Sequence, residues 1–390
     1  MNSELARRTI LPFHTFLWKI ASRCNLNCTY CYVYNSADSR WRDQPSLMSE
    51  RAARQTAARI REHCEAHGKR SASIVFHGGE PLLGGLAHLE MLTTVIADTL
   101  GGTGLKLSVG IQSNGLLFDR EIGDLMLARG MSIGVSLDGP PAINDLHRID
   151  HRGRPTGARL EECLALLTSP RYRPIFSGFL CVINPDTDPV ALTRYLLSYD
   201  PPGIDFLLPL DNHDRRPPGK EADLRATPYG DWLIASFDHW LRQPTTTRIR
   251  FFNSLIGLIF GAPSGVEALG LDPVTLIVVE TNGDIEAVDS LKSAFQGATR
   301  LGYDVFHHDF DTVAADMAVR SRQLGTEALC EECRVCPVVR VCGGGYLPHR
   351  YSARRGFDNP SVYSSDLEKV IRHIHATLSR ELAPQLGMTA

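Results

Sequence analysis

The chain has 390 residues, of which 43% are hydrophobic and 22% charged, and its formal net charge at pH 7 is -3. This composition is typical of a globular protein with a sizeable core and gives no sign of a nucleic-acid binder, which would usually be basic. No apolar run reaches the roughly 18 residues of a membrane span, and the first residues lack the apolar stretch of a signal peptide. We therefore predict a cytoplasmic protein without a nucleic-acid or membrane partner.

Strand and helix patterns alternate over about the first 215 residues. The pattern predicts helices over residues 49–66, 86–101, 118–130, 158–169 and 188–200, and strands over 72–76, 105–115, 131–141, 175–184 and 203–210. Short links between strands and helices predict a parallel sheet covered by helices. About six such units are too few for an eight-stranded barrel, so we expect an α/β fold with an open, partial (β/α)6 barrel.

The pattern changes after a polar, proline-rich stretch at residues 211–228. An amphipathic helix is predicted over Tyr229–Leu241, and residues 274–291 predict a β-hairpin with Asn282 and Gly283 at its turn. A last helix is predicted from Ser365 to Leu382.

Ten cysteines are many for a cytosolic chain, where clustered cysteines more often bind metal than form disulfides. Three of them, Cys24, Cys28 and Cys31, are separated by three residues and by two. A structural zinc ion takes four protein ligands, whereas three cysteines on a 4Fe–4S cluster leave one iron free for a small molecule. A chance grouping of thiols, or a zinc site completed by His14, is the alternative.

The cysteine spacing, with Tyr30 before the last cysteine, resembles that of the radical SAM enzymes. The sequence HGGEP, which ends at Pro81, resembles their GGEP motif. The resemblance implies that Gly78 and Gly79 let the backbone approach S-adenosylmethionine (SAM), and that Glu80 accepts its amino group. A plain turn is the alternative interpretation of this motif.

Polar residues follow the next two predicted strands. The resemblance implies that Ser113 and Asn114 face the ribose of SAM, and that Ser136 and Arg148 bind its methionine carboxylate. For Arg148 the alternative is a solvated surface charge. In this family the cluster reduces SAM to methionine and a 5′-deoxyadenosyl radical, which abstracts hydrogen from an unactivated carbon, while the protein orients the reactants.

A second cysteine group lies near the C-terminus and comprises Cys330, Cys333, Cys336 and Cys342. It resembles the SPASM domain of radical SAM peptide maturases, with two departures. A cysteine usual in the preceding hairpin is replaced by Val288, and a later one is replaced by Ser364 or Ser365. We therefore predict one auxiliary 4Fe–4S cluster rather than two, with zinc or a partly empty site as the alternative.

Residues 342–351 and 356–363 in and after the second cysteine group, together with residues 278–295 of the predicted hairpin, look most similar to the cyclophane-forming radical SAM/SPASM maturases of ribosomally made peptides. The resemblance implies a precursor peptide as substrate, loss of a side-chain β-hydrogen, and a carbon–carbon crosslink to an aromatic ring two residues away. The auxiliary cluster would take an electron, and Glu286 or Asp289 in the hairpin would take the proton, unless both are ordinary hairpin charges. His349 and Arg350 are candidates for holding the peptide, or are structural.

The implied partners are an electron donor such as flavodoxin or ferredoxin and a separate leader-binding protein, unless the core itself recognises the leader. Formylglycine formation, as in the anaerobic sulfatase maturases, and a thioether crosslink are rival activities. A zinc-binding interaction module without catalysis is the alternative from another class. We predict a radical SAM core at residues 8–225, a bridging region at 226–320 and a SPASM-like domain at 321–390.

Overall fold

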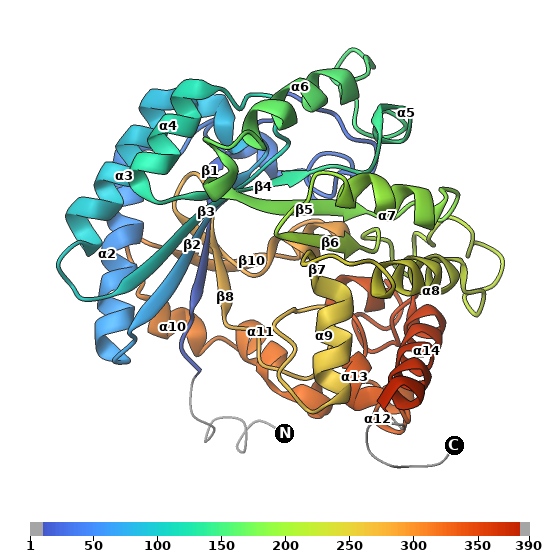
Figure 1. Cartoon of the computed structure of the whole chain (residues 1–390). Coiled ribbons are helices and arrows are strands. Elements are labelled where there is room, and N and C mark those ends of the chain that lie inside the picture. The colour runs from blue at the N-terminus through green and yellow to red at the C-terminus, as the bar shows by residue number, and fades with distance from the viewer. Residues whose placement is uncertain (1–10, 383–390) are drawn as a thin grey trace. The chain divides into compact units, whose positions relative to one another are not determined.

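A computed structural model describes residues 11–382, which divide into two compact units (Figure 1). The first unit contains residues 11–135, 149–176 and 273–324, and the second contains the remaining described residues. The predicted limits at residues 8 and 390 lie outside the described part. Among residues 11–382, no helix is both long enough and apolar enough to cross a membrane.

The first unit is built on a sheet with strand order β10-β9-β8-β1-β2-β3-β4. Its strands are β1 (Thr15–Ala21), β2 (Ser71–Gly78), β3 (Lys106–Ser113), β4 (Ser132–Ser136), β8 (Leu276–Val279), β9 (Asp284–Glu286) and β10 (Arg300–Asp304). Strands β8, β1, β2, β3 and β4 pair in parallel, while β9 and β10 pair antiparallel at the edge. The predicted α/β fold with a mostly parallel sheet is confirmed.

The predicted hairpin is present, and its first strand joins the main sheet. Strand β8 pairs with β1, which brings residues 273–324 into the first unit, while residues 226–272 belong to the second. This pairing joins residues about 260 positions apart, which no local pattern reveals. The units are a division by compactness, and the predicted domain borders at residues 225 and 320 stay predictions.

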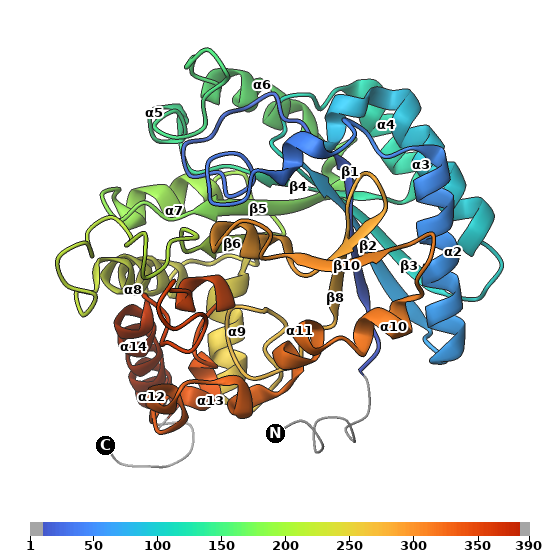
Figure 2. The same ribbon diagram turned by 180° about the vertical axis from the view of Figure 1, so that it is seen from behind.

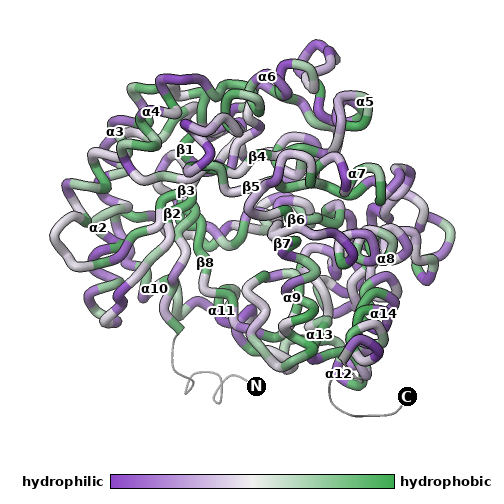
Figure 3. The backbone as a smooth tube through the Cα atoms, viewed as in Figure 1, coloured by the Kyte–Doolittle hydropathy of each residue, from purple (hydrophilic) through white to green (hydrophobic). Residues whose placement is uncertain are grey.

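Helices of the first unit follow the parallel strands, and α2, α3 and α4 lie side by side along β2 and β3 in both views (Figures 1 and 2). The helices are α2 (Glu50–Ala66), α3 (Gly85–Leu100), α4 (Arg120–Arg129), α6 (Gly157–Leu167), α10 (Phe310–Ala314) and α11 (Met317–Arg320). The Ser49 and Asp119 side chains cap α2 and α4, and Gly130 ends α4 in the left-handed conformation. Hydrophilic and hydrophobic residues alternate along α2, as expected of a helix with one buried face (Figure 3).

The second unit contains the parallel strands β5 (Phe176–Val182), β6 (Gly203–Leu207) and β7 (Arg248–Ile249). Its helices are α5 (Pro141–Asn144), α7 (Pro189–Leu197), α8 (Pro228–Leu241), α9 (Arg250–Ile259), α12 (Glu331–Arg334), α13 (Val339–Cys342) and α14 (Ser364–Leu382). Aromatic side chains of α8 and α9, Phe237 and Phe252, pack edge to face in its core. The sequence predicted α8 and α14 within one residue but did not predict α9.

Candidate functional site

The first cysteine group lies on an irregular loop that directly follows β1. Cys24, Cys28 and Cys31 are each half-buried. The loop turns tightly, because the Cys31 amide donates to the Cys28 carbonyl at 2.9 Å and the Asn35 side-chain amide donates to the same oxygen at 2.9 Å. His151 bonds the Cys24 carbonyl at 2.8 Å. The three sulfurs thus come from one short, hydrogen-bonded segment.

The GGEP residues pack against the chain that enters this loop. The Gly79 amide donates to the Ala21 carbonyl at 2.8 Å, and the Glu80 amide donates to the Arg23 carbonyl at 2.9 Å. A β-carbon on Gly78 would lie 2.0 Å from the Ala21 oxygen, and one on Gly79 would lie 2.1 Å from the Arg23 oxygen. Both glycines are therefore needed for contact between two backbone segments, a reason that the motif alone did not reveal.

Glu80 is fully buried and joins the ends of β2 and β3. Its carboxylate accepts hydrogen bonds from the Ser113 hydroxyl at 2.7 Å, the Asn114 amide at 2.7 Å and the Leu82 amide at 3.0 Å. Three donors on one carboxylate stabilise its charged form. The structure thus gives Glu80 a structural task, and its role as acceptor for SAM stays a prediction.

Asn114 connects this carboxylate to the cysteine loop. Its side-chain amide donates to Asn25 at 2.7 Å and lies 3.8 Å from the sulfur of Cys24. Three of the predicted segments, the cysteine loop, the GGEP loop and the QSNG loop, are therefore brought together in one unit. Pro81 is buried and begins the short 3-10 helix after Glu80, and Tyr30 is half-buried beside Cys31.

The donor set fits a cluster with three cysteine ligands. Burial raises the pKa of Cys24 to about 12, with a smaller contribution from the negative charge of Glu80. Such a thiol loses its proton only when a metal binds, because the ligand is the thiolate. Ser136, at the end of β4, and Arg148, which is 6% exposed, belong to the second unit, and their predicted contact with SAM stays a prediction.

A buried group of charges lies beside the GGEP loop. Lys19 of β1 is paired in register with His77 of β2, and its ammonium is 3.0 Å from the ring Nδ1 of His77. The same ammonium forms an ion pair with Asp289 of the hairpin, whose carboxylate also accepts the Tyr32 hydroxyl at 2.5 Å. The predicted base Asp289 is therefore not an exposed hairpin charge: it is 9% exposed and directly joined to the end of β1.

The electrostatics of this group keep Asp289 ionised and His77 neutral. Burial acts to raise the pKa of Asp289, but the positive charge of Lys19 and the hydrogen bonds from Lys19 and Tyr32 outweigh it and hold that pKa well below the usual range. Burial, together with the positive charge of Lys19, lowers the pKa of His77 to about 4. The site thus presents an anionic carboxylate whose proton affinity is set mainly by one lysine.

The other predicted base, Glu286, has different surroundings. It is 3% exposed, pairs with Arg40 at 2.8 Å and Lys292 at 3.5 Å, and accepts the Thr299 hydroxyl at 2.7 Å. Lys292 also bonds Glu280 at 2.5 Å. Two cations and a hydroxyl enclose this carboxylate, which links β9 to Arg40 and Lys292. The role of Glu286 or Asp289 as a proton acceptor stays a prediction.

The second cysteine group begins at Cys330, which directly precedes α12, and extends through α12 and the following link to Cys342 at the end of α13. Cys330, Cys333 and Cys342 are buried, and Cys336 is half-buried. Burial raises the pKa of Cys333 to about 12 and that of Cys342 to about 11, so free thiols here would be neutral. Four cysteines within 13 residues are a ligand set whose chemistry suits an iron–sulfur cluster or zinc.

Gly343 fixes the turn after Cys342. It adopts a φ of 63°, and a β-carbon on it would lie 1.7 Å from the Gly270 carbonyl oxygen. We expect Gly343→Ala to lower the free energy of unfolding by about 3 kcal/mol, because both the backbone and its neighbour must shift. Urea denaturation would measure this. Gly257→Ala in α9, where the new β-carbon meets only Ala262 at 3.6 Å, should be neutral or slightly stabilising, and equal losses in both variants would contradict the steric argument.

The structure also groups three ligand-type side chains that the sequence did not single out. His63, His67 and Asp311 have ligand atoms within 4.8 Å of one another. However, the His63 Nε2 accepts the Phe13 amide at 2.9 Å, so its Nδ1 carries the proton that bonds Asp311 at 2.6 Å. Both nitrogens of His63 are used, and the cluster is a structural tether between α2 and α10 rather than a metal site.

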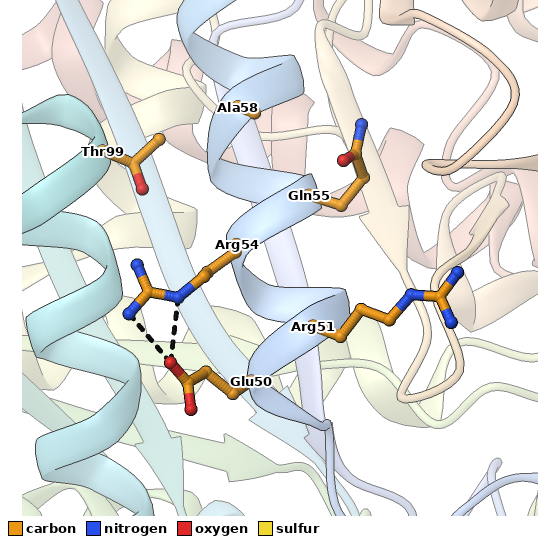
Figure 4. Close-up of a pocket in the computed structure, with 6 residues that line it drawn as sticks. All are labelled: Glu50, Arg51, Arg54, Gln55, Ala58 and Thr99. Atoms are coloured by element: carbon orange, nitrogen blue, oxygen red, sulfur yellow. Dashed lines mark hydrogen bonds and ion pairs between the residues drawn. The ribbon is translucent and has the colours of Figure 1, made fainter.

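A surface depression between α2 and α3 carries none of this chemistry. Figure 4 shows its residues on the two helices, where Arg54 pairs with Glu50. The other residues that line it are Arg51, Gln55, Ala58 and Thr99. No cysteine or predicted site residue lies among them.

Comparison with known proteins identifies the class of protein to which this fold and cysteine loop belong. Residues 18–189 match the family model of the radical SAM superfamily, so this part of the chain is a radical SAM domain. Among known proteins, the chain is similar to the cysteine-type anaerobic sulfatase-maturating enzyme of Clostridium perfringens, with 25% identity covering 86% of this chain and 88% of that protein. The serine-type anaerobic sulfatase-maturating enzyme of Klebsiella aerogenes is 27% identical, and the match covers 89% of this chain and 82% of that protein.

Solved structures show a similar fold. The structure described as "Native anSMEcpe with bound AdoMet" has a TM-score of 0.80 at 24% identity and covers 94% of this chain and 98% of that one. The structure of Streptococcus suis SuiB bound to precursor peptide SuiA has a TM-score of 0.58 at 13% identity, and the match covers 88% of this chain and 74% of that one. The neighbours thus extend over both units.

Proposed function

We propose that this chain is a radical SAM enzyme that crosslinks a ribosomally made precursor peptide through a three-residue cyclophane. The observation that carries the proposal is the direct connection of the cysteine loop to the ends of β2 and β3 through Asn114 and Glu80. Relatives and structural neighbours that act on proteins or bind peptides support a peptide substrate.

Each predicted residue has a separate task in this proposal. A cluster on Cys24, Cys28 and Cys31, with SAM, supplies the 5′-deoxyadenosyl radical when bound. Glu80 accepts the amino group of SAM and, through its hydrogen bonds, holds Ser113 and Asn114, which face the ribose. Gly78 and Gly79 let the GGEP loop reach the cofactor. Ser136 and Arg148 hold the methionine carboxylate.

The reaction removes two hydrogens from the peptide. One leaves as an atom from the side-chain β-carbon to the 5′-deoxyadenosyl radical. After the carbon–carbon bond forms, Asp289 takes the proton from the aromatic carbon. Cys330, Cys333, Cys336 and Cys342 would hold an auxiliary cluster, which would accept the remaining electron. An acceptor with a low pKa suffices for this proton, because the proton leaves a ring that has lost its aromaticity and is strongly acidic. A flavodoxin or ferredoxin supplies the electron that starts each turnover.

Formylglycine formation is the second candidate. The similarity to sulfatase-maturating enzymes over more than four fifths of the chain favours it. The second cysteine group favours the crosslink, because Val288 and Ser364 stand where the SPASM pattern of such enzymes usually has cysteines.

The test is anaerobic reconstitution with iron and sulfide, followed by incubation with SAM, dithionite and a co-expressed precursor peptide encoded beside this chain. We expect 5′-deoxyadenosine, together with a peptide that lacks two hydrogens and does not fragment inside one three-residue segment. A product that reacts with a hydrazide probe is an aldehyde and would replace the cyclophane with formylglycine. Absence of 5′-deoxyadenosine from iron-loaded protein would overturn the enzyme class itself.

A further inference from the structure

Arg350 is a buried cation whose hydrogen bonds all go to one short turn. Its side chain donates to the carbonyl oxygens of Gly343 at 2.8 Å, Gly344 at 3.0 Å and Gly345 at 2.6 Å. These three glycines all have φ between 63° and 77°, which turns successive carbonyls toward one donor. The turn begins immediately after Cys342, so the guanidinium is fixed against the second cysteine group.

The charge of Arg350 has no carboxylate partner. Arg350 is 8% exposed, and among residues 11–382 no aspartate or glutamate forms an ion pair with it. A guanidinium keeps its proton in proteins, and a buried charge without an opposite charge is strongly unfavourable. Carbonyl oxygens accept hydrogen bonds from Nε and Nη2 but do not neutralise the charge of the guanidinium.

The groups that can supply a compensating negative charge to Arg350 are the neighbouring cysteines. Burial lowers the pKa of Arg350, and negative charge on Cys333, Cys342 and Cys330 would act in the opposite direction. A cysteine that keeps its proton carries no charge and does not compensate the cation. Metal binding requires thiolates, so it would create the missing negative charge next to the guanidinium.

We propose that Arg350 is the counter-cation of an iron–sulfur cluster on Cys330, Cys333, Cys336 and Cys342, and that its charge raises the reduction potential of that cluster. This inference rests on the auxiliary cluster proposed above. Reduction adds one negative charge to the cluster, and a fixed positive charge in a buried environment stabilises the reduced form more than the oxidised form. Arg350 is thus a positioning residue for electron uptake and does not itself contact the peptide.

The experiment uses the full chain with Cys24, Cys28 and Cys31 replaced by alanine, so that bound iron belongs to the second group. Iron and zinc are measured after reconstitution, and the midpoint potential is followed by EPR during titration with dithionite. In this background, Arg350→Gln is expected to shift the equilibrium about tenfold toward the oxidised cluster, equivalent to about 59 mV for one electron. Arg354→Gln, at an exposed arginine of the same unit, should leave the potential unchanged.

Arg350→Lys separates charge from hydrogen bonding, because lysine keeps the charge but cannot bond three carbonyls in one plane. A potential near that of the background in Arg350→Lys, with a lowered potential in Arg350→Gln, supports the proposal. Retention of iron by Arg350→Lys, together with loss of iron from Arg350→Gln, also supports the proposal. Loss of iron in both variants would assign Arg350 to the turn rather than to the cluster. An unchanged potential in an iron-loaded Arg350→Gln protein would also overturn the inference. A background that binds zinc or no metal would reject the auxiliary cluster before any Arg350 variant is compared.

Discussion

Cys28→Ala is expected to abolish formation of 5′-deoxyadenosine from SAM, because two cysteines cannot hold a 4Fe–4S cluster with one free iron in place. The structure makes Cys28 a suitable choice. Its carbonyl accepts hydrogen bonds from Cys31 and Asn35, and the substitution keeps this backbone oxygen. The loop should therefore keep its turn while losing one sulfur.

The measurement is 5′-deoxyadenosine by liquid chromatography after anaerobic reconstitution, together with iron content. Bound iron should fall by about four atoms per chain, the content of one cluster. The matched control is Cys64→Ala, since Cys64 is a lone buried cysteine of α2 in the same unit. It should retain both iron and activity. A Cys28→Ala protein that still cleaves SAM would show that the first cysteine group is not the site of cleavage.

Much of the fold could be predicted because its elements are marked by local patterns. Ser49 caps α2 and Asp119 caps α4 as short side chains do at helix starts, and the turn at Gly283 has the positive φ that this position requires. The cysteine spacing likewise predicts a metal-binding loop, because the candidate ligands lie within eight residues of one another.

What the sequence could not predict depends on contacts between distant residues. Lys19 lies in the apolar stretch of β1, and its partner Asp289 is 270 residues away, so no local pattern connects them. Glu80 is a motif residue in the sequence, and only the approach of β3 shows that its oxygens bond Ser113 and Asn114. Likewise, the sequence leaves Arg350 open to peptide binding or a structural role, and its bonds to three carbonyl oxygens depend on the folded turn.

His349, the residue before Arg350, is another side chain whose role the sequence could not reveal. It is 2% exposed, and its ring packs against Tyr363 with centroids 4.7 Å apart. Burial, together with the positive charge of Arg350, lowers its pKa to about 3, so it is a neutral core residue. The sequence could not distinguish this packing role from peptide binding, because the aromatic partner lies 14 positions along the chain.

Asp289→Asn is expected to reduce the yield of modified peptide at least about 100-fold while 5′-deoxyadenosine is still formed, because the asparagine amide cannot take the departing proton. Hydrogen abstraction does not need the carboxylate, so cofactor cleavage becomes uncoupled from product. The readout is the ratio of modified peptide to 5′-deoxyadenosine. Asp284→Asn, the same change at another carboxylate of the hairpin, should leave that ratio unchanged.

The substitution also removes the counter-charge of buried Lys19, which could cost about 3 to 5 kcal/mol of stability. The double variant Lys19→Met with Asp289→Asn removes both charges and controls for this effect. If the double variant is stable and still makes no product, the defect belongs to proton transfer. If it recovers product, Asp289 is only the partner of Lys19 and some other group accepts the proton.

The pH dependence of product formation by the Lys19→Met single variant is an independent test of Asp289 as the proton acceptor. In the wild type, the pKa of Asp289 is held well below the usual range, so the carboxylate is ionised throughout the range in which the protein is assayed. Product formation should therefore not decline on mild acidification. Without Lys19, burial raises that pKa with less opposition, and the acid limb of the product profile should move to higher pH. A profile identical to that of the wild type would remove Asp289 from the proton-transfer step, whatever the effect of the variant on stability.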